Sequence, residues 1–518
     1  MAEYILSHDV GTGGSKSVLV EPGGTVVGKV FRPYPVHYPA PGWAEQDPGD
    51  WWEAVSSGTR ELLECCGVSP REILCLTYST QQLGIVPMRS GGEPLRRAII
   101  WMDNRAAPEA RRVMARFGGA TVFAAVAGTP LCGKDGIPKL LWLKHHEPDV
   151  YRRMVCFVDV GGYLLYRSTG RMVMELSGAG VFGLDLKRKT WLTGIMRYVG
   201  IDPVKLPPLV KSTDVVGALT RQAASDCGLL EGTPVVAGAG DAPAAAVGAG
   251  AVDEGDGHVY LGTSAWVSVI TRRTFAGRHG AVVIQAADPE RNFLHAQMET
   301  AGGCVRWIAE EFYRSELRYM SFDEVYGLLD KEAEVAPAGS GYLLFTPWLY
   351  GERVPFTDTF ARAASVNLSA DHRRGNLMRA VYEGVAYNVA WTLEVVEKTY
   401  GFALPRLRVA GGGARSSIWM QILADVTGRP VDVVANPQEV SAVGAALTAA
   451  VGIGLYPSFA ALRGLVRTSG TFEPNPATAD VYRFLSETYR AVYRHLKPLY
   501  RRLNSRRLPE ADSRHTGS

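Results

Sequence analysis

The sequence has no marked excess of charge of either sign. Its 55 Lys and Arg residues stand against 52 Asp and Glu residues, a formal charge of +3 over 518 residues. Because a nucleic acid or an anionic membrane selects a basic surface, we expect neither as a partner. The chain also lacks an apolar run of 18 residues and a basic segment followed by an apolar one at its start. We therefore expect no membrane span and no secretory leader, and a cytoplasmic location.

Cysteine is scarce and shows no pairing pattern. None of the seven cysteines forms a Cys-x-x-Cys pair, which argues against a disulfide framework or a zinc ribbon. We expect free thiols in a reducing compartment. The cysteines are residues 65, 66, 75, 132, 156, 227 and 304.

The hydrophobic pattern predicts an α/β protein with two similar halves. With 518 residues, 47% of them hydrophobic, the chain can form at least two domains. Three apolar segments separated by Gly-rich turns predict sequential antiparallel strands, and alternating helices and strands follow. The predicted strands are 4–10, 15–20, 25–32 and 73–79, and the predicted helices are 51–66, opened by Asp50, and 138–151.

A second strand-turn-strand pattern near residue 258 suggests a duplicated architecture. HVYLGTSAWVSVI places a Gly-Thr pair at the tip of a predicted hairpin, as DVGTGGSKSVLV does near the N-terminus. The acidic, small-residue stretch 249–257 interrupts the pattern. We therefore predict domains at 1–250 and 256–505, followed by a frayed, polar tail at 506–518.

The first Gly-rich turn has the composition of a phosphate cradle. Its glycines let backbone N–H groups approach an anion closely, and its Thr, Ser and Lys add side-chain donors. No GxxxxGK[ST] sequence occurs, so the turn is not a Walker A loop. Asp9 would repel phosphate unless a divalent cation stood between them, which argues for Mg²⁺. A plain β-hairpin is the alternative, although the second Gly-Thr turn favours one nucleotide held by both domains.

A third glycine cluster lies between a predicted strand and a predicted helix. Gly411, Gly412 and Gly413 would let a flat group such as adenosine approach the backbone, and Ser416 and Ser417 would lie at the helix N-terminus. A tight turn that needs glycine only for packing is an equally open alternative.

At this point the motifs taken together resemble the FGGY carbohydrate kinases, and within them the xylulokinases most closely, over residues 3 to 500. The similarity rests on DVGTGGSK, PGWAEQDP, IIWMDNRA, PKLLWLKHHEP, GAGDAPAA, LGTSAW, GERVPF, RAVYEGVAYN and AGGGARSSIWMQ. It implies two ribonuclease-H-like domains of the actin, hexokinase and Hsp70 superfamily flanking a catalytic cleft. It also implies transfer of the ATP γ-phosphoryl group to a primary hydroxyl of a ketose or polyol.

The resemblance assigns the catalytic base to Asp241. This residue follows an apolar strand and precedes a small-residue helix, so a helix N-cap is the structural alternative. Phosphoryl transfer needs a carboxylate that accepts the proton of the attacking hydroxyl, and a strand end is a rigid place to present one. We expect Asp241 to serve in both capacities.

Further site residues are implied by the same matching. Asp9 would hold Mg²⁺ through water, and Asp103 and Trp266 would lie on the sugar side, with surface ion pairing and core packing as their respective alternatives. Arg105, Trp43 and Glu45 are further sugar-side candidates. The residues expected on the ATP side are Thr12, Gly13, Lys16, Gly262, Thr263, Gly302, Gly412, Gly413 and Ser416.

The chain departs from the xylulokinase pattern mainly on the sugar side. Typical xylulokinases carry Gln-Met-His-Gly in a loop whose His touches the sugar, whereas this chain has Gln81-Gln82-Leu83-Gly84. Ala242, after the base, replaces a frequent Asn or Gln. Losing a polar contact to a hydroxyl can change discrimination by ~10⁴. The resemblance as a whole nevertheless favours D-xylulose as the substrate, with Gln81, Gln82 and Leu83 as the residues that would contact it.

Other functions stay open at this point. An FGGY kinase for L-xylulose, ribulose, glycerol or erythritol is one alternative, and a nucleotide switch or sugar sensor without phosphoryl transfer is another. The expected partners are a sugar and ATP, and a homodimer is an open possibility. Asp241 favours the enzyme, since a switch needs no base directed at a sugar hydroxyl.

Overall fold

The computed structural model describes residues 3–127, 130–275 and 280–505, and the predicted tail 506–518 lies outside them. The chain divides into two compact units, and each contains segments that are distant in sequence. The first unit comprises residues 1–258, 268–295 and 434–469, and the second comprises the remainder. The domain limits predicted from the sequence stay a prediction.

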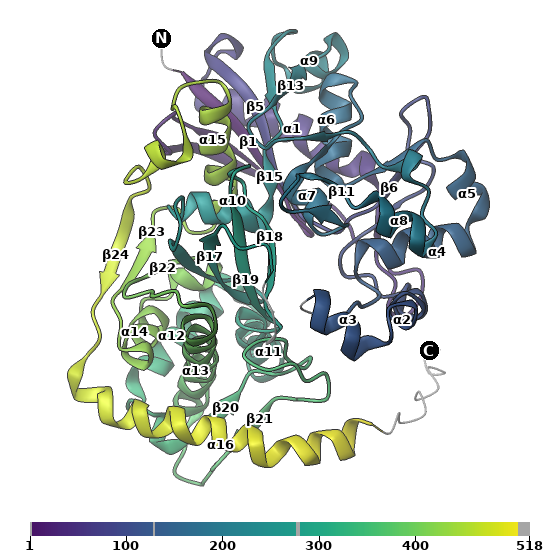
Figure 1. The fold of residues 1–518 in the computed structure, drawn as a ribbon. Helices are drawn as coiled ribbons and strands as arrows, with labels where there is room; N and C mark the ends of the chain where they lie inside the picture. The colour runs from purple at the N-terminus through teal and green to yellow at the C-terminus, as the bar shows by residue number, and fades with distance from the viewer. Residues whose placement is uncertain (1–2, 128–129, 276–279, 506–518) are drawn as a thin grey trace, which may run out of the picture. The chain divides into compact units, whose positions relative to one another are not determined.

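The first unit is built on a mixed sheet of order β13-β14-β5-β1-β2-β3, with β15 paired to β5 (Figure 1). β1, β2 and β3 are antiparallel neighbours, which confirms the predicted three-strand meander. β5 then joins β1 in parallel. The strands of this unit are β1 (Tyr4–Val10), β2 (Gly14–Val20), β3 (Val26–Pro33), β4 (Glu45–Gln46), β5 (Ile73–Thr80), β6 (Val86–Met88), β7 (Ala98–Ile99), β8 (Cys156–Val158), β9 (Met174–Glu175), β10 (Leu184–Asp185), β11 (Thr190–Trp191), β12 (Leu209–Val210), β13 (Val215–Ala218), β14 (Pro234–Val236), β15 (Ala239–Gly240) and β18 (Val282–Gln285).

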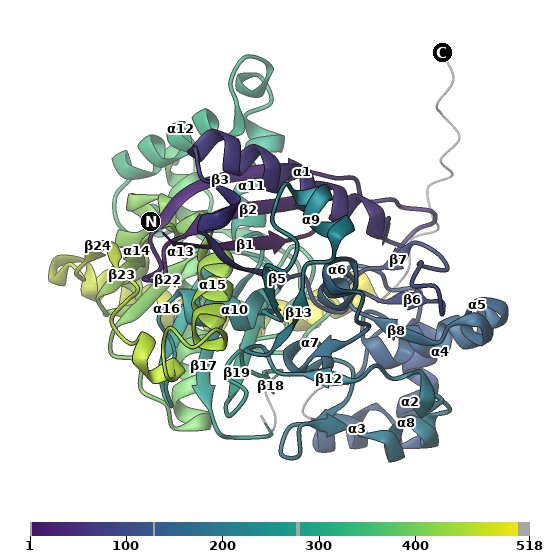
Figure 2. The same ribbon diagram turned by 90° about the horizontal axis from the view of Figure 1, so that it is seen from above.

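Helices cover both faces of this sheet. Leu6 faces a core with Trp51 and Val55 of α1, whereas its neighbour Ile5 faces a core with Ala442 of α15, as strand alternation requires (Figure 2). The helices of the first unit are α1 (Pro48–Cys66), α2 (Ala107–Arg116), α3 (Ala120–Ala127), α4 (Gly136–His146), α5 (Pro148–Arg153), α6 (Val160–Thr169), α7 (Leu176–Gly180), α8 (Thr193–Val199), α9 (Arg221–Cys227), α10 (Asp241–Gly248) and α15 (Val440–Gly452).

Two predicted helices differ in their limits from the observed ones. The helix expected from residue 51 begins at Pro48, because the Asp47 side chain accepts the N–H of Gly49 and proline fits the first turn. Asp50 lies inside that turn and does not open the helix. The helix expected over 138–151 is two helices, α4 and α5, because Pro148 has no N–H to continue the first.

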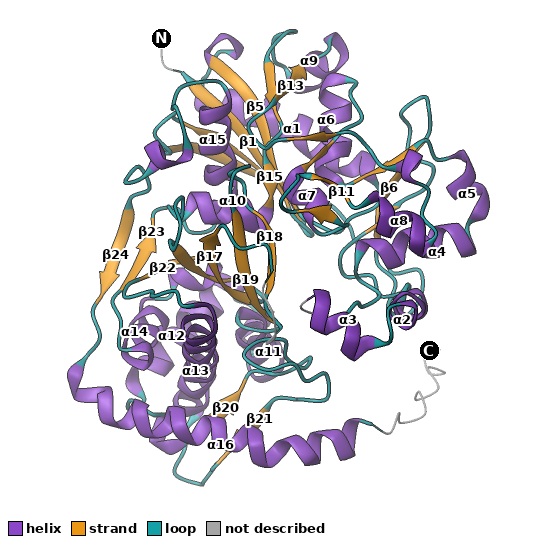
Figure 3. Cartoon of the chain, viewed as in Figure 1, coloured by secondary structure: helices purple, strands orange, loops and turns teal. Residues whose placement is uncertain are grey.

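The second unit also combines parallel strands with helices (Figure 3). β22 pairs in parallel with β16 and β23, and Tyr387 of α13 lies in a core with Tyr482 and Tyr489 of α16. Its helices and strands are α11 (Gly302–Phe312), α12 (Phe322–Val335), α13 (Arg374–Tyr400), α14 (Ser417–Thr427), α16 (Ala479–Asn504), β20 (Leu344–Thr346), β21 (Ala364–Val366) and β22 (Leu407–Ala410). The strands with residues in both units are β16 (Gly257–Leu261), β17 (Ala265–Thr271), β19 (Asn292–Met298), β23 (Val431–Val434) and β24 (Thr468–Phe472).

Candidate active site

Three strand ends bring the candidate metal ligand Asp9, the loop after β5 and the candidate base Asp241 together in the first unit. β1 and β15 both run parallel to β5, with Asp9 opposite Ser79 and Gly240 opposite Thr80. Since parallel strands end at the same edge of a sheet, Asp9, the loop after Thr80 and Asp241 share one edge.

Asp9 lies beside the lysine of the Gly-rich turn. Its Oδ1 accepts a hydrogen bond from Ser79 Oγ at 3.1 Å, and its Oδ2 is 3.6 Å from Lys16 Nζ. The Lys16 ammonium also donates to the Gln438 carbonyl at 2.8 Å. Lys16 is thus oriented by groups of its own unit, next to the predicted metal ligand.

Asp241 is the first residue of α10 and not its N-cap, which corrects the expected capping role. Gly240 occupies the N-cap position, and Asp241 Oδ1 accepts the adjacent Ala242 N–H, at 2.8 Å. Desolvation, followed by the negative charge of Asp9, raises the Asp241 pKa to about 7. A carboxyl with a pKa near neutrality suits a general base.

Thr12 and Ser15 of the Gly-rich turn differ in their partners, since the buried Ser15 Oγ has none among the described residues. Thr12 Oγ1 accepts a hydrogen bond from Trp101 Nε1 at 2.8 Å and donates to Gln81 Oε1 at 3.4 Å. Gly13 is exposed, and a Cβ added to it would meet no atom within 4 Å. The turn therefore leaves backbone open at Gly13, as a cradle for an anion requires.

The loop after β5 holds the three predicted substrate residues in different ways. Gln81 Nε2 donates to the carbonyl of Gly11 at 3.1 Å and to Gln46 Oε1 at 2.8 Å. Gln82 Nε2 donates to the Ser177 carbonyl at 2.9 Å. Leu83 is half-buried and has a left-handed φ of 62°.

A buried lysine missed by the sequence analysis fixes this loop. Lys139 Nζ donates to the carbonyls of Leu83 at 3.0 Å and Ile100 at 2.8 Å. Burial lowers the Lys139 pKa to about 7. A lysine inside the apolar pattern of a helix was the only signal for it in the sequence.

Asp103 forms a buried ion pair, so the surface ion pair considered for it is wrong. Both Asp103 oxygens accept from Arg105, at 2.7 to 3.0 Å, and Oδ2 also accepts the Ala44 N–H at 2.6 Å. The Arg105 guanidinium lies 3.8 Å from the Trp43 ring centroid and forms an ion pair with Glu45 at 2.7 Å. This pairing favours a structural role for Asp103, and its contact with a sugar stays a prediction.

A second buried acidic group behind Asp241 was also missed. Ser177 Oγ accepts the Gly240 N–H at 2.9 Å and donates to Glu175, whose Oε2 also accepts the Ser177 N–H at 2.8 Å. Burial raises the pKa of Glu175 to about 8 and that of nearby Asp159 to about 6. No sequence motif marks these residues, and the contact that places them behind Asp241, Ser177 with Gly240, joins residues 63 positions apart.

In the second unit the Gly-Thr turn is bound to the start of α11. The N–H groups of Gly302 and Gly303 donate to the carbonyls of Gly262 and Thr263 at 2.8 and 2.9 Å. A Cβ on Gly302 would lie 2.6 Å from the Gly262 oxygen, so glycine is needed for this approach. The Gly302 N–H is therefore engaged within the protein.

The third glycine cluster forms the predicted turn between β22 and α14. Gly412 is exposed, and a Cβ on Gly413 would lie 2.8 Å from the Trp419 ring. Ser416 caps α14, as expected, since its Oγ accepts the Trp419 N–H at 3.2 Å and donates to Asp330 at 2.8 Å. Packing against Trp419 therefore explains why residue 413 is a glycine, while the exposed Gly412 is open to a ligand.

Trp266 lies in the second unit on the strand that follows the Gly-Thr turn. Its ring stacks on Tyr260 with centroids 4.0 Å apart and an interplanar angle of 5°. The side chain is half-buried. The stack fixes the orientation of the ring, and its contact with a sugar stays a prediction.

The acidic edge fits a hard cation held by few protein ligands. Within the residues that the structure describes, no three His, Cys, Asp or Glu side chains gather as a metal site. Mg²⁺ commonly keeps several waters and takes one or two carboxylates together with substrate phosphates. The like charges of Asp9 and Asp241, which raise the pKa of Asp241, are the charge arrangement that such a cation neutralises.

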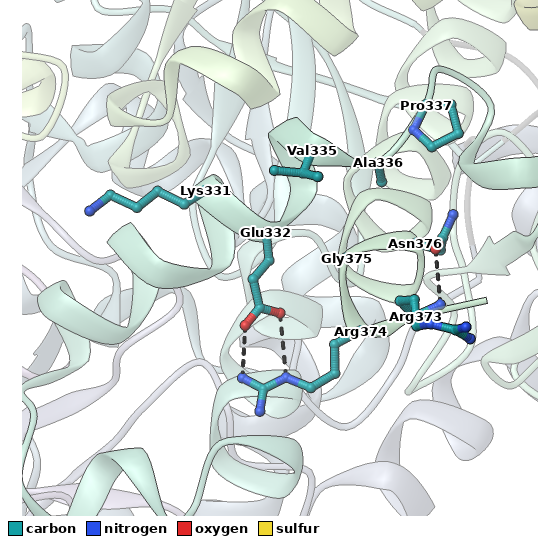
Figure 4. Close-up of a pocket in the computed structure, with 9 residues that line it drawn as sticks. All are labelled: Lys331, Glu332, Val335, Ala336, Pro337, Arg373, Arg374, Gly375 and Asn376. Carbon is teal, nitrogen blue, oxygen red and sulfur yellow. Dashed lines mark hydrogen bonds and ion pairs between the residues drawn. The ribbon is translucent and has the colours of Figure 1, made fainter. Parts of the chain in front are cut away.

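A pocket of about 800 Å³ lies elsewhere, at the start of α13 in the second unit (Figure 4). Arg374 and Glu332, which both line the pocket, pair at 2.9 Å, and Arg374 also pairs with Glu316 at 3.0 Å. None of the predicted site residues lines this pocket, and we assign it no function.

Comparisons with known proteins agree along almost the whole chain. The N-terminal domain of the FGGY family of carbohydrate kinases matches residues 4–248, and the C-terminal domain matches residues 257–453. Xylulose kinase of Bacillus subtilis (strain 168) is 30% identical, over 97% of this chain and 99% of its own length.

Two solved structures have the same fold. Xylulose kinase from Rhodospirillum rubrum gives a TM-score of 0.83 at 30% identity, covering 96% of this chain and 100% of its own. Gluconate kinase from Lactobacillus acidophilus gives a TM-score of 0.86 at 25% identity, covering 97% and 100%. The likeness confirms the expected two-domain α/β fold.

Proposed function

The chain belongs to the FGGY family of carbohydrate kinases, and we propose that it transfers the γ-phosphoryl group of ATP to a primary hydroxyl of D-xylulose, giving xylulose 5-phosphate. The observation that carries the proposed chemistry is the strand edge at which Asp241, with its pKa raised to about 7, lies near Asp9.

Asp241 acts as the general base in this proposal. Its carboxylate accepts the proton of the sugar hydroxyl as that oxygen attacks the γ-phosphorus in line. The first turn of α10 and the short strand β15 hold the carboxylate on rigid backbone. A base on such elements keeps its position relative to a bound hydroxyl, and positioning together with electrostatic stabilisation accounts for most of phosphoryl-transfer catalysis.

Backbone and side-chain donors of both units bind ATP. In the first unit these are the Gly13 backbone, Thr12 and Lys16, and in the second unit the turn at Gly262 and Thr263 faces phosphate. Gly302, Gly412, Gly413 and Ser416 line the adenosine side. The exposed backbone of Gly13 and Gly412 supports these assignments.

Asp9 would hold the Mg²⁺ that accompanies ATP, through water. The cation, when bound, neutralises phosphate charge and permits an anion next to Asp9. Ser79 and Lys16 orient the Asp9 carboxylate for this role.

Trp266 contributes an aromatic face to the sugar in this proposal. The loop residues Gln81, Gln82 and Leu83 contact the sugar. Asp103 supports this region from within the buried ion pair with Arg105. Among the helices of residues 3–127, 130–275 and 280–505, none has the length and apolar composition needed to cross a bilayer. A cytoplasmic location and assembly as a homodimer remain proposals.

The test is an ATP-coupled assay of purified protein with D-xylulose, L-xylulose, D-ribulose, D-gluconate, glycerol and erythritol. We expect sugar-dependent ADP release, highest in kcat/KM with D-xylulose. A tenfold preference for another acceptor would refute the xylulose assignment and leave the kinase assignment intact. ADP release that no acceptor stimulates would favour a switch or sensor.

The same assay tests the base. Asp241→Asn should lower kcat by at least ~10², the usual minimum for loss of a general base, while calorimetry still detects sugar binding. Gln222→Met, on the exposed face of α9, is the control and should keep the wild-type kcat. Near-normal turnover of Asp241→Asn would remove Asp241 from the mechanism.

A further inference from the structure

The loop after β5 contains one side chain that can recognise a substrate hydroxyl in place of the missing imidazole. We propose that Gln82 presents its Oε1 to a hydroxyl of the acceptor, so that the site selects a neutral ketose or polyol over an aldonic acid. This inference rests on the proposed phosphoryl transfer to a sugar hydroxyl and names the residue that decides which acceptor is accepted.

The orientation of the Gln82 amide follows from its partner. Gln82 Nε2 is 2.9 Å from the carbonyl oxygen of Ser177. A carbonyl can only accept, so the amide must turn its NH₂ group toward Ser177 and its oxygen away. Within the part of the chain that the structure describes, no donor is bonded to Gln82 Oε1, and the side chain is half-buried. The loop therefore holds an amide oxygen that is turned away from Ser177 and is open to a donor.

Gln82 also lies next to the proposed base. A Cβ added to Gly240 would be 2.6 Å from Gln82 Cδ and 2.7 Å from Nε2, so the amide covers the residue that precedes Asp241. Ser177 connects the two sides, since its carbonyl binds Gln82 while its Oγ accepts the Gly240 N–H at 2.9 Å. Ser177 is thus a positioning residue for both.

The neighbours of Gln82 in the loop cannot take over this contact. Leu83 has an apolar side chain, and its carbonyl is bound by Lys139 at 3.0 Å. Gln81 is buried and uses Nε2 for Gly11 and Gln46 and Oε1 for Thr12. Gln82 is therefore the loop residue whose polar atom is left for a substrate.

The hydrogen-bond chemistry of this acceptor opposes a substrate carboxylate. The titratable groups on its strand edge and around its anchor are Asp9, paired with Lys16 at 3.6 Å, Asp241, Asp159, and Glu175, which is mostly protonated at neutral pH; the Lys139 ammonium is directed at two carbonyls. A carboxylate facing an amide oxygen has no hydrogen to share, whereas a hydroxyl has one. Because a site built to bind a hydroxyl rejects an analogue without it by ~10⁴, we expect at least a hundredfold preference for the best neutral acceptor over D-gluconate.

The experiment compares wild type, Gln82→Met, Gln82→Met with Leu83→His, and Gln222→Met across the same acceptors. Gln82→Met keeps the size of the side chain and removes its acceptor. We expect it to lower kcat/KM for the best neutral acceptor by ~30-fold or more, with losses that differ by at least tenfold among acceptors. The double variant recreates the Gln-Met-His-Gly sequence and should recover D-xylulose activity to within tenfold of wild type.

Each outcome separates this inference from the proposed function. Equal losses for all acceptors, a loss below threefold, no rescue by the double variant, or D-gluconate as the best acceptor would overturn the role of Gln82, while the kinase assignment stands. If wild type phosphorylates none of the acceptors, the proposed function fails. In that case calorimetry measures the dissociation constants of wild type and variants for the same acceptors, and the ratios of these constants test the role of Gln82. If no acceptor binds, the inference about Gln82 and the proposed function are both overturned.

Discussion

Leu83 is held in a backbone conformation that most residues with a side chain avoid. Its φ of 62° costs roughly 1–2 kcal/mol in an L-residue, and the two hydrogen bonds from Lys139 to the carbonyls of Leu83 and Ile100 hold the loop in place. Histidine enters this region more readily than leucine. We therefore expect Leu83→His to fold normally and, because Gln82 already supplies an acceptor, to change kcat/KM for D-xylulose less than tenfold.

The comparison variant is Leu83→Val, because a β-branched side chain is particularly unfavourable at positive φ. Thermal denaturation should show a lower melting temperature for Leu83→Val than for either wild type or Leu83→His. Equal melting temperatures would show that the backbone at residue 83 carries no strain. A gain in activity above tenfold in Leu83→His would show that the missing imidazole had not been replaced.

Single residues were predictable where a strand end or a known motif marked them. Asp9 and Asp241 were found in this way, and they share one edge of the sheet because β1 and β15 both pair with β5. Ser177 and Lys139 were not found, since each acts on a backbone group that only the fold brings near. The burial that sets the pKa of Asp241 was equally absent from the sequence.

At the scale of elements, the position of Asp241 depends on the contact between α10 and α15. A Cβ on Gly444 would lie 1.8 Å from the Ala244 carbonyl oxygen, so the two helices meet at backbone distance. Overpacking such a contact costs about 1–3 kcal/mol or more. We expect Gly444→Ala to lower the free energy of unfolding by at least that amount and to lower kcat, as α10 shifts at its first residue.

Gly194→Ala is the matched control for this prediction. Gly194 lies in α8 of the same unit, and an added Cβ would meet no atom within 4 Å. Alanine there should be neutral or slightly stabilising. Urea denaturation and the coupled assay measure both variants, and a Gly444→Ala protein as stable and active as Gly194→Ala would contradict the importance of the helix contact.

The turn between β9 and α7 should make stability depend on pH. The Glu175 pKa is raised to about 8 by burial, against about 4.3 in an unfolded chain. The folded state therefore retains the proton longer than the unfolded state, and the contribution of Glu175 to stability falls as pH rises from about 4.3 to 8. The expected slope is about 1.4 kcal/mol per pH unit.

Glu175→Gln removes this ionisation while its amide oxygen can still accept from the Ser177 N–H. The free energy of unfolding of the variant, measured by urea titration at pH 5, 6, 7 and 8, should rise relative to wild type as pH increases. Raised carboxyls that are not coupled to Glu175, such as Glu352, are present in both proteins and cancel in the difference, whereas Asp159, whose charge raises the Glu175 pKa, contributes to it. A difference that does not change with pH would refute the prediction.

The elements themselves were largely predictable, because their patterns are local. The alternation in 4–10, 15–20 and 25–32 gave β1 to β3, and the run 73–79 gave β5. The limits failed where one residue changed the backbone: Asp47 with Pro48 moved the start of α1, and Pro148 divided the helix predicted over 138–151. At both places a capping residue or a proline sets the helix limit, and the hydrophobic periodicity does not reveal it.

At the scale of the whole molecule, the sequence order conceals how the first unit is completed. Residues 434–469 follow the second unit's long segment 296–433 along the chain, yet they belong to the first unit. Ala442, Ala446, Ala449 and Ala450 of α15 form one core with Ile5 of β1 and its neighbours. An alanine-rich helix carries no signal for which sheet it covers, so this assignment required the structure.

The first unit should therefore fail to fold from residues 1–258 alone. Without α15, one sheet face would expose Ile5, Val18 and Val20, and Ser7 Oγ would lose its bond to the Ala442 carbonyl, which is 2.8 Å long. We expect fragment 1–258 to bind a hydrophobic dye and to unfold without a cooperative transition. Joining residues 268–295 and 434–469 to that fragment through flexible Gly/Ser linkers should reduce dye binding and restore a cooperative urea transition, whereas adding 268–295 alone should not, because α15 is the segment that covers the face. If fragment 1–258 alone unfolds cooperatively and binds little dye, then α15 is dispensable for this sheet, and the completion of the unit by a distant segment has no energetic consequence.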